Sequence, residues 1–70
     1  MDKKTLAKAK ELENDIESIE RVLKEYDEQH HWIQVVSPRR DNGQSARFQR
    51  DIAEWLRRQK EIYKKELEDL

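Results

Sequence analysis

The chain has 70 residues and no cysteine, so it is one small domain without disulfide bonds or thiolate metal sites. Its 15 basic and 16 acidic side chains nearly cancel, which argues against intrinsic disorder and against general coating of nucleic acid. A core of this size rarely contributes more than about 3–5 kcal/mol. We therefore expect a single domain over residues 1–70 that forms a homodimer or a higher oligomer.

Sequence signals for a membrane or for export are absent. No apolar run approaches the roughly 20 residues of a membrane span. The start Met-Asp-Lys-Lys does not lead into an apolar signal core. We therefore expect a cytoplasmic protein that has no membrane partner.

Apolar residues in the first part of the chain recur with alternating spacings of three and four, which is typical of one face of a helix. This heptad pattern predicts a first helix over about residues 3–28. Its core positions are Ala9, Leu12, Ile16, Ile19, Leu23 and Tyr26. Opposite charges four residues apart, as in Glu17 and Arg21, support the helix without creating it.

The middle of the chain has a different pattern. Aromatic and β-branched residues over about 31–36 favour one short strand or extended segment. Pro38 holds Ser37 away from helical angles, and Asp41-Asn42-Gly43 predicts a turn. A lone strand leaves its backbone hydrogen bonds unmade, and no second strand is evident. We therefore expect a second copy of the chain to pair with it.

An apolar arc of about 140° predicts a second helix over about residues 45–68, with Ser45 as its N-cap. The arc contains Phe48, Ile52, Trp55, Leu56, Ile62, Tyr63, Leu67 and Leu70. The 11-residue spacing of Ile52 and Tyr63 departs from a heptad, so we do not expect tight supercoiling. Trp55 is expected in the core. Gln59 also lies in the arc, where it either sets the register across an interface or occupies a half-exposed edge.

These elements define the predicted fold, which is mainly α. The two helices, about 3–28 and 45–68, form an antiparallel hairpin with the short extended or β segment at about 31–36 between them. Two hairpins that face each other would bury both apolar stripes in a helical-bundle homo-oligomer. The predicted seam of the core and oligomer comprises Leu12, Ile16, Ile19, Leu23, Tyr26, Phe48, Ile52, Trp55, Leu56, Ile62 and Tyr63.

The central segment is basic, because residues 30–50 carry four arginines and one aspartate. Arginine suits two-pronged contacts with phosphate or carboxylate groups. The candidate partner-binding or anion-binding residues are Trp32, Arg39, Arg40, Arg47, Arg50, Arg57 and Arg58. The alternative is that the arginines form a solvated face paired with neighbouring acidic residues such as Asp51 and Glu54. The sequence leaves both interpretations open.

Catalytic and metal-binding patterns are weak. Asp27 and His31 have the i,i+4 spacing of helical metal ligands, but a third and a fourth ligand are missing. The serines have no His/Asp arrangement around them, and a single glycine cannot form a Gly-rich phosphate loop. We expect no metal, no cofactor and no enzymatic activity.

The layout of a Lys/Glu-rich helix, the segment WIQVV (32–36), a charged turn and the helix WLRRQKEIYKKELEDL (55–70) resembles a known group of proteins. These are small helical-hairpin proteins encoded by phages and mobile elements of low-GC Gram-positive bacteria. The resemblance covers the whole chain and rests on composition and layout. It implies docking onto a host or defence component, or sequestration of that component's ligand.

Two functional hypotheses follow. The first is a non-enzymatic small interaction protein that self-associates and docks on a protein partner. The second is a binder of a phosphate-bearing ligand, such as a nucleotide or a nucleic acid, through the central Arg-rich segment. Salt dependence separates them, because phosphate capture by several arginines weakens steeply as salt rises.

Overall fold

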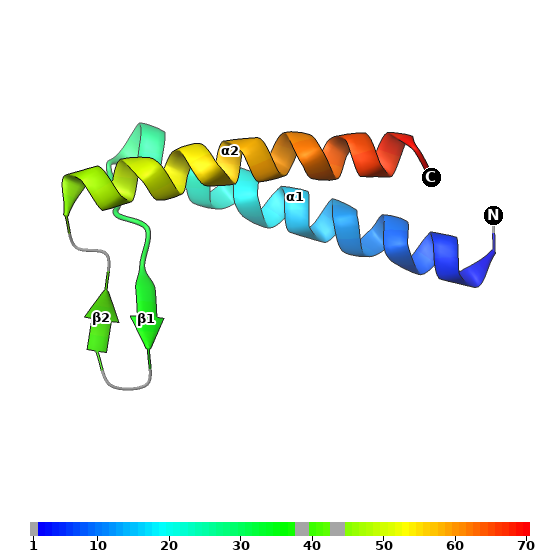
Figure 1. Cartoon of the computed structure of the whole chain (residues 1–70), viewed down its shortest axis with the longest axis horizontal. Coiled ribbons are helices and arrows are strands. Elements are labelled where there is room, and N and C mark those ends of the chain that lie inside the picture. The colour runs from blue at the N-terminus through cyan, green and yellow to red at the C-terminus, as the bar shows by residue number, and fades with distance from the viewer. Residues whose placement is uncertain (1, 38–39, 43–44) are drawn as a thin grey trace.

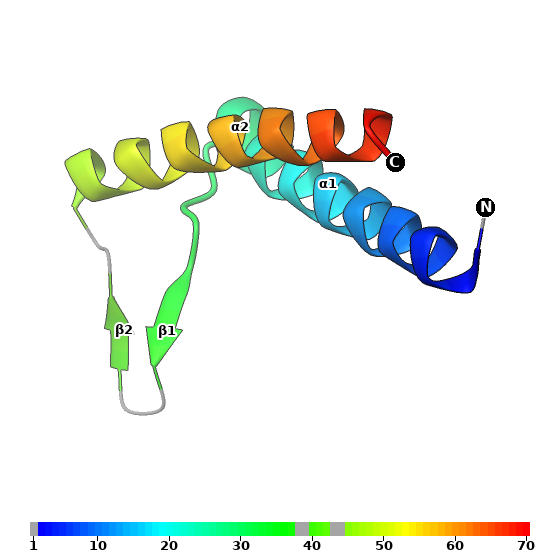
Figure 2. The same ribbon diagram turned by 45° about the vertical axis from the view of Figure 1, so that its right-hand side comes forward.

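The computed structural model describes residues 2–37, 40–42 and 45–70. In chain order its elements are helix α1 (Lys3–Gln29), strand β1 (Val35–Ser37), strand β2 (Arg40–Asn42) and helix α2 (Ala46–Glu68). The helices pack against each other in opposite directions and cross obliquely, with both termini at one end and the strands at the other (Figure 1, Figure 2). The predicted helical hairpin is confirmed.

Helix α1 begins and ends with local hydrogen bonds. The Asp2 carboxylate caps its first turn by accepting a hydrogen bond from the Thr5 N–H at 2.7 Å. That hydrogen bond lowers the pKa of Asp2 below its ordinary value of 3.8, because it favours the charged form. At the other end His30 has left-handed angles, φ 58° and ψ 28°, and its N–H donates to the Glu25 carbonyl. His30 therefore ends the helix in a conformation that glycine usually supplies.

Helix α2 begins where the sequence predicts. The Ser45 hydroxyl oxygen accepts a hydrogen bond from the Phe48 N–H at 3.1 Å, as expected of an N-cap. No glycine or proline follows Ser45, so nothing interrupts the helix before Glu68. Lys65 in the last turn places a positive charge near the carbonyl end of the helix dipole.

The strand prediction needs correction. The strand runs from Val35 to Ser37, and residues 31–34 are not part of it. It pairs antiparallel with Arg40–Asn42 of the same chain, so a second copy is not needed to complete it. Asp41 and Asn42, predicted in a turn, lie in β2, and Gly43 is outside the described residues. Together β1 and β2 form an arm that projects away from the helices (Figure 1, Figure 2).

The core confirms the seam predicted for the first helix. Four of its residues are buried, namely Leu12, Ile16, Ile19 and Leu23. Each contributes roughly 1.5–3 kcal/mol by leaving water. Tyr26, which is half-buried, packs against the cluster that Ile19 and Leu23 form with Ala53 of α2. Ile33 from the connecting segment closes the same cluster.

The seam predicted for the second helix is divided into two lines. The inner line faces α1 and contains the buried Gln49 and Ala53 and the half-buried Leu56, Lys60, Tyr63 and Leu67. Its spacings alternate between four and three, so the contact with α1 follows a heptad after all. The outer line lies beside it and contains Phe48, Ile52, Trp55, Gln59 and Ile62. Trp55 is therefore not in the core of the single chain, because half of it is exposed.

Candidate interaction surface

The outer line is the most apolar part of the exposed surface on α2. Phe48, Trp55 and Ile62 are 45%, 50% and 49% exposed. They follow one another at intervals of seven residues, which places them roughly 10.5 Å apart along one side of the helix. The half-buried residues Ile52 and Gln59 fill the intervals. Large apolar side chains in a continuous row are typical of surfaces that contact another molecule.

A groove runs between the outer line and α1. It has a volume of about 280 Å³, and Asp15, Ser18 and Ile19 of α1 line one wall. The opposite wall consists of Trp55, Leu56, Gln59 and Tyr63 of α2. Gln59 therefore occupies a half-exposed edge in the single chain, as the second of the two sequence interpretations expected.

Trp32 extends this surface toward the arm. It is 53% exposed, whereas its neighbour Ile33 is half-buried against the core. The two therefore alternate as neighbours in an extended segment do. Trp32 lines a hollow of about 300 Å³ together with Val22 of α1. Val22 lies one helical turn after Ser18, so this hollow continues along the same side of α1 as the groove.

Gln49 fixes the segment that carries Trp32. The side-chain Oε1 of Gln49 accepts a hydrogen bond from the Ile33 N–H at 2.6 Å. Its Nε2 donates to the Ile33 carbonyl oxygen at 2.7 Å. Gln49 is 2% exposed, so both bonds form away from water and carry more weight than surface ones. Sequence periodicity missed Gln49, because a polar residue on an apolar face gives no signal of a partner 16 positions away.

Among the predicted arginines whose side chains the structure describes, Arg57 differs from the others in its contacts. Arg57 crosses to α1 and makes an ion pair with Asp27, with 2.6 Å between Nη2 and Oδ1. Arg47, Arg50 and Arg58 are exposed, and within the described part of the chain they form no ion pair. Arg40 belongs to β2, and Arg39 lies outside the described residues. Arg47 and Arg50, on the first turns of α2, are exposed near the arm and form no described ion pair.

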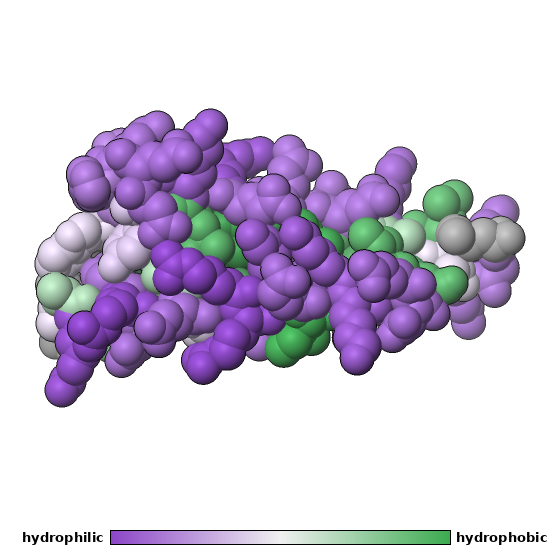
Figure 3. Space-filling model, turned by 90° about the horizontal axis from the view of Figure 1, so that it is seen from above, coloured by the Kyte–Doolittle hydropathy of each residue, from purple (hydrophilic) through white to green (hydrophobic). Residues whose placement is uncertain are grey.

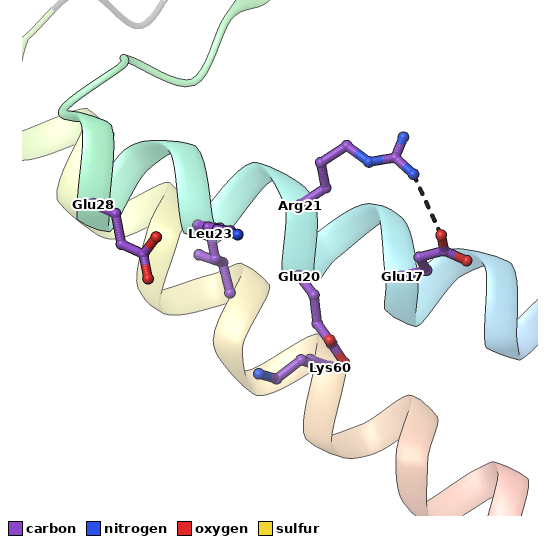
Figure 4. Close-up of a pocket in the computed structure, with 7 residues that line it drawn as sticks. Glu17, Glu20, Arg21, Leu23, Glu28 and Lys60 are labelled. Carbon is purple, nitrogen blue, oxygen red and sulfur yellow. Dashed lines mark hydrogen bonds and ion pairs between the residues drawn. The ribbon is translucent and has the colours of Figure 1, made fainter.

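A charged hollow of about 480 Å³ lies elsewhere on the helix pair (Figure 4). Glu17, Glu20, Arg21, Lys24 and Glu28 of α1 line it with Lys60 of α2, and Leu23 is its one apolar residue. Arg21 and Glu17 form an exposed ion pair at 3.4 Å, so they contribute little to stability.

Seen from above, hydrophilic side chains cover most of the molecule, and hydrophobic ones emerge between them along its length (Figure 3). The exposed large apolar residues of α2 are Phe48, Trp55 and Ile62 of the outer line.

No known protein family, curated protein or solved structure matches the chain. Across residues 2–37, 40–42 and 45–70, no group of three His, Cys, Asp or Glu side chains is placed to hold a metal ion. Neither of the described helices combines the length and the apolar character required to cross a membrane. The exposed side chains of the chain itself therefore define the candidate interaction surface.

Proposed function

We propose that the protein is a non-enzymatic interaction module that self-associates through the outer line of α2 and docks on a protein partner. The observation that supports self-association is the row of Phe48, Trp55 and Ile62, each about half exposed in the single chain. Leaving these side chains in water is unfavourable at roughly 25 cal/mol per Å² of apolar surface. A second copy supplies a matching row, so both rows leave water in one two-fold contact.

The size of the chain adds to this argument. Five apolar residues are buried in the described part of the single chain, and one of them is Ala53. Small domains that lack disulfide bonds and metal sites usually gain further stability by association. A contact along the outer line and the adjoining groove would add the side chains that the hairpin leaves half exposed. Self-association would therefore stabilise the fold as well as create the assembly.

The arm end of the molecule is the proposed contact for the protein partner. An isolated two-stranded arm is marginally stable in water, and this arm contacts neither helix among the described residues. Arg47 and Arg50 are exposed on the adjoining first turns of α2 and carry no described ion pair. Two free guanidinium groups beside a projecting arm favour a partner with an acidic surface.

Variants that add one charge test self-association. Trp55→Glu places a carboxylate in the outer line, and we expect it to leave the protein monomeric while circular dichroism stays helical. Leu6→Glu is the control, because Leu6 is 57% exposed and lies on α1 away from the outer line. The control should associate as the wild type does. Equal association of both variants in sedimentation velocity would overturn the proposed use of the outer line.

Charge reversal at the arm end tests docking on a partner. Arg47→Glu/Arg50→Glu should abolish binding to the partner captured by the wild-type protein from its native host, because attraction becomes repulsion. Lys3→Glu/Lys4→Glu reverses the same number of charges at the opposite end of the molecule and should keep binding. Loss of binding in both variants would contradict a localised contact. A nucleic acid as the captured partner, with steep salt dependence, would favour the phosphate-binding alternative instead.

A further inference from the structure

We infer that the second copy lies antiparallel along α2, with Asp51 facing Arg58 of the partner subunit. This inference rests on the proposed self-association and adds its direction and register. It follows from charges that flank the outer line on the side away from α1. Asp51, Arg58 and Lys65 occupy that flank at intervals of seven residues, and all three are exposed.

The flanking charges distinguish between the two directions in which the helices can pack. In an antiparallel helix pair, flanking positions on one side of the seam face the same flanking positions of the partner. In a parallel pair the flank with Asp51 and Arg58 would instead face the opposite flank, which here contains Leu56 and Tyr63. Those side chains are uncharged and half-buried against α1, so parallel packing gains no ion pairs at these positions. The charges therefore favour antiparallel packing.

Within an antiparallel pair, the flanking charges also distinguish one register from its neighbours. When Asp51 faces Arg58 of the partner subunit, the two-fold axis produces the same pair again at the other end. A shift of one heptad in one direction places Asp51 against Asp51 of the partner subunit. A shift in the other direction places Arg58 against Arg58 of the partner subunit. Only the unshifted register combines attraction with no facing pair of like charges among these positions.

The residues of the outer line also pack differently in the different registers. In the unshifted register Ile52 packs on Trp55 of the partner subunit, and Phe48 packs on Gln59 of the partner subunit. The register that faces two arginines would place Phe48 on Glu66 of the partner subunit. Burial of a carboxylate against an aromatic ring costs more than burial of an amide, because the carboxylate is charged. Apolar packing and flanking charges thus both disfavour the register that faces two arginines.

A charge-swap experiment tests this arrangement. Asp51→Arg and Arg58→Asp each turn two attractions per dimer into repulsions, and we expect each to raise the dimer Kd about tenfold at low salt. The double variant Asp51→Arg/Arg58→Asp restores both pairs with reversed polarity and should return Kd close to the wild-type value. Glu54→Arg is the matched control, since Glu54 is exposed on α2 beyond the flank. It should change Kd far less than Asp51→Arg does.

The outcomes separate register from self-association. Recovery in the double variant supports the register. Unchanged Kd in both single variants, with Trp55→Glu still monomeric, overturns the register while self-association stands. A monomeric wild type overturns both proposals.

The absence of cysteine allows a second, positional readout. Asp51→Cys and Arg58→Cys variants can each be labelled at one site, and packed helices lie about 8–10 Å apart. A short bismaleimide should join the two variants in a mixture faster than it joins either variant to itself. Equally fast linking of Asp51→Cys alone would contradict the register.

Discussion

The side-chain amide of Gln49 is hydrogen-bonded to the backbone of Ile33 as an adjacent β-strand would be, with one bond given and one accepted. This pair connects α2 to the segment that follows α1. It satisfies backbone groups that packing against the core removes from water. The pair also orients Trp32, the next residue back along the chain, toward solvent. The closed end of the helical hairpin and one edge of the candidate surface therefore depend on one side chain.

The Gln49–Ile33 pair gives the first prediction. Gln49→Leu keeps the volume roughly constant but leaves the Ile33 N–H and carbonyl unpaired, so we expect the free energy of unfolding to fall by about 2–4 kcal/mol. Gln29→Leu is the control, because Gln29 is exposed at the end of α1, outside the outer line, and should change stability by less than about 1 kcal/mol. Urea denaturation at a fixed protein concentration measures both. Similar losses in the two variants would show that the Ile33 bonds contribute little.

His30 gives the second prediction. Its φ of 58° is unfavourable for a residue with a Cβ atom and costs about 1 kcal/mol. His30→Gly should therefore raise the free energy of unfolding by a similar amount, since glycine adopts this angle without strain. His30→Ala retains the Cβ atom and should give no gain. Thermal melts measure the stability of both variants. A stabilised alanine variant would mean that the imidazole itself destabilises the native state.

The third prediction concerns Asp27 and Arg57. Both side chains are nearly half exposed, at 46% and 44%, so water and salt screen their attraction. A double-mutant cycle with alanine at both positions should give a coupling of less than about 1 kcal/mol that declines as salt rises. A coupling several times larger and insensitive to salt would mean that the pair is protected from solvent, for instance beneath a second copy of the chain.

The pKa of Asp2 gives the fourth prediction. Its folded value is lowered because the carboxylate accepts the Thr5 N–H, so the stabilisation is present above the unfolded pKa and is lost as pH falls through the folded pKa. Helicity of the first turn should therefore decrease on acidification below the ordinary value of 3.8. Asp2→Asn keeps an oxygen acceptor without a titrating group and should remove this acid-side loss. NMR titration of the Thr5 amide follows both proteins. An identical titration in the asparagine variant would assign the transition to another carboxyl group.

Periodicity in the sequence predicts the helical hairpin, because apolar spacing and N-cap residues act locally. It fails where distant backbone groups decide the structure. Arg40–Asn42 is polar and contains Asp and Asn, which strands disfavour, yet it pairs with β1 through bonds that need no particular side chain. Ala53 carries too little apolar weight to stand out in the pattern, but its small size lets it be fully buried against α1. A count of large apolar residues therefore misses Gln49 and Ala53, the two buried residues of the inner line.

The exposure of the outer line is likewise decided by helix packing. Sequence periodicity groups Phe48, Trp55 and Ile62 with the core, since one helix face cannot reveal which of its flanks meets α1. The arginines separate for a related reason. Arg57 lies near enough to α1 to reach Asp27, whereas Arg47 lies on another side of the helix. Only the packing of α2 against α1 distinguishes the inner line, which faces α1, from the outer line, which lies beside it.

Sedimentation equilibrium of the wild-type chain at several concentrations in the tens of micromolar is the most direct test of the central claim, self-association through the outer line. We expect a mass approaching twice the 8.6 kDa of the monomer at the highest concentration, with a fall toward 8.6 kDa on dilution. A constant mass of 8.6 kDa at every concentration would contradict the claim.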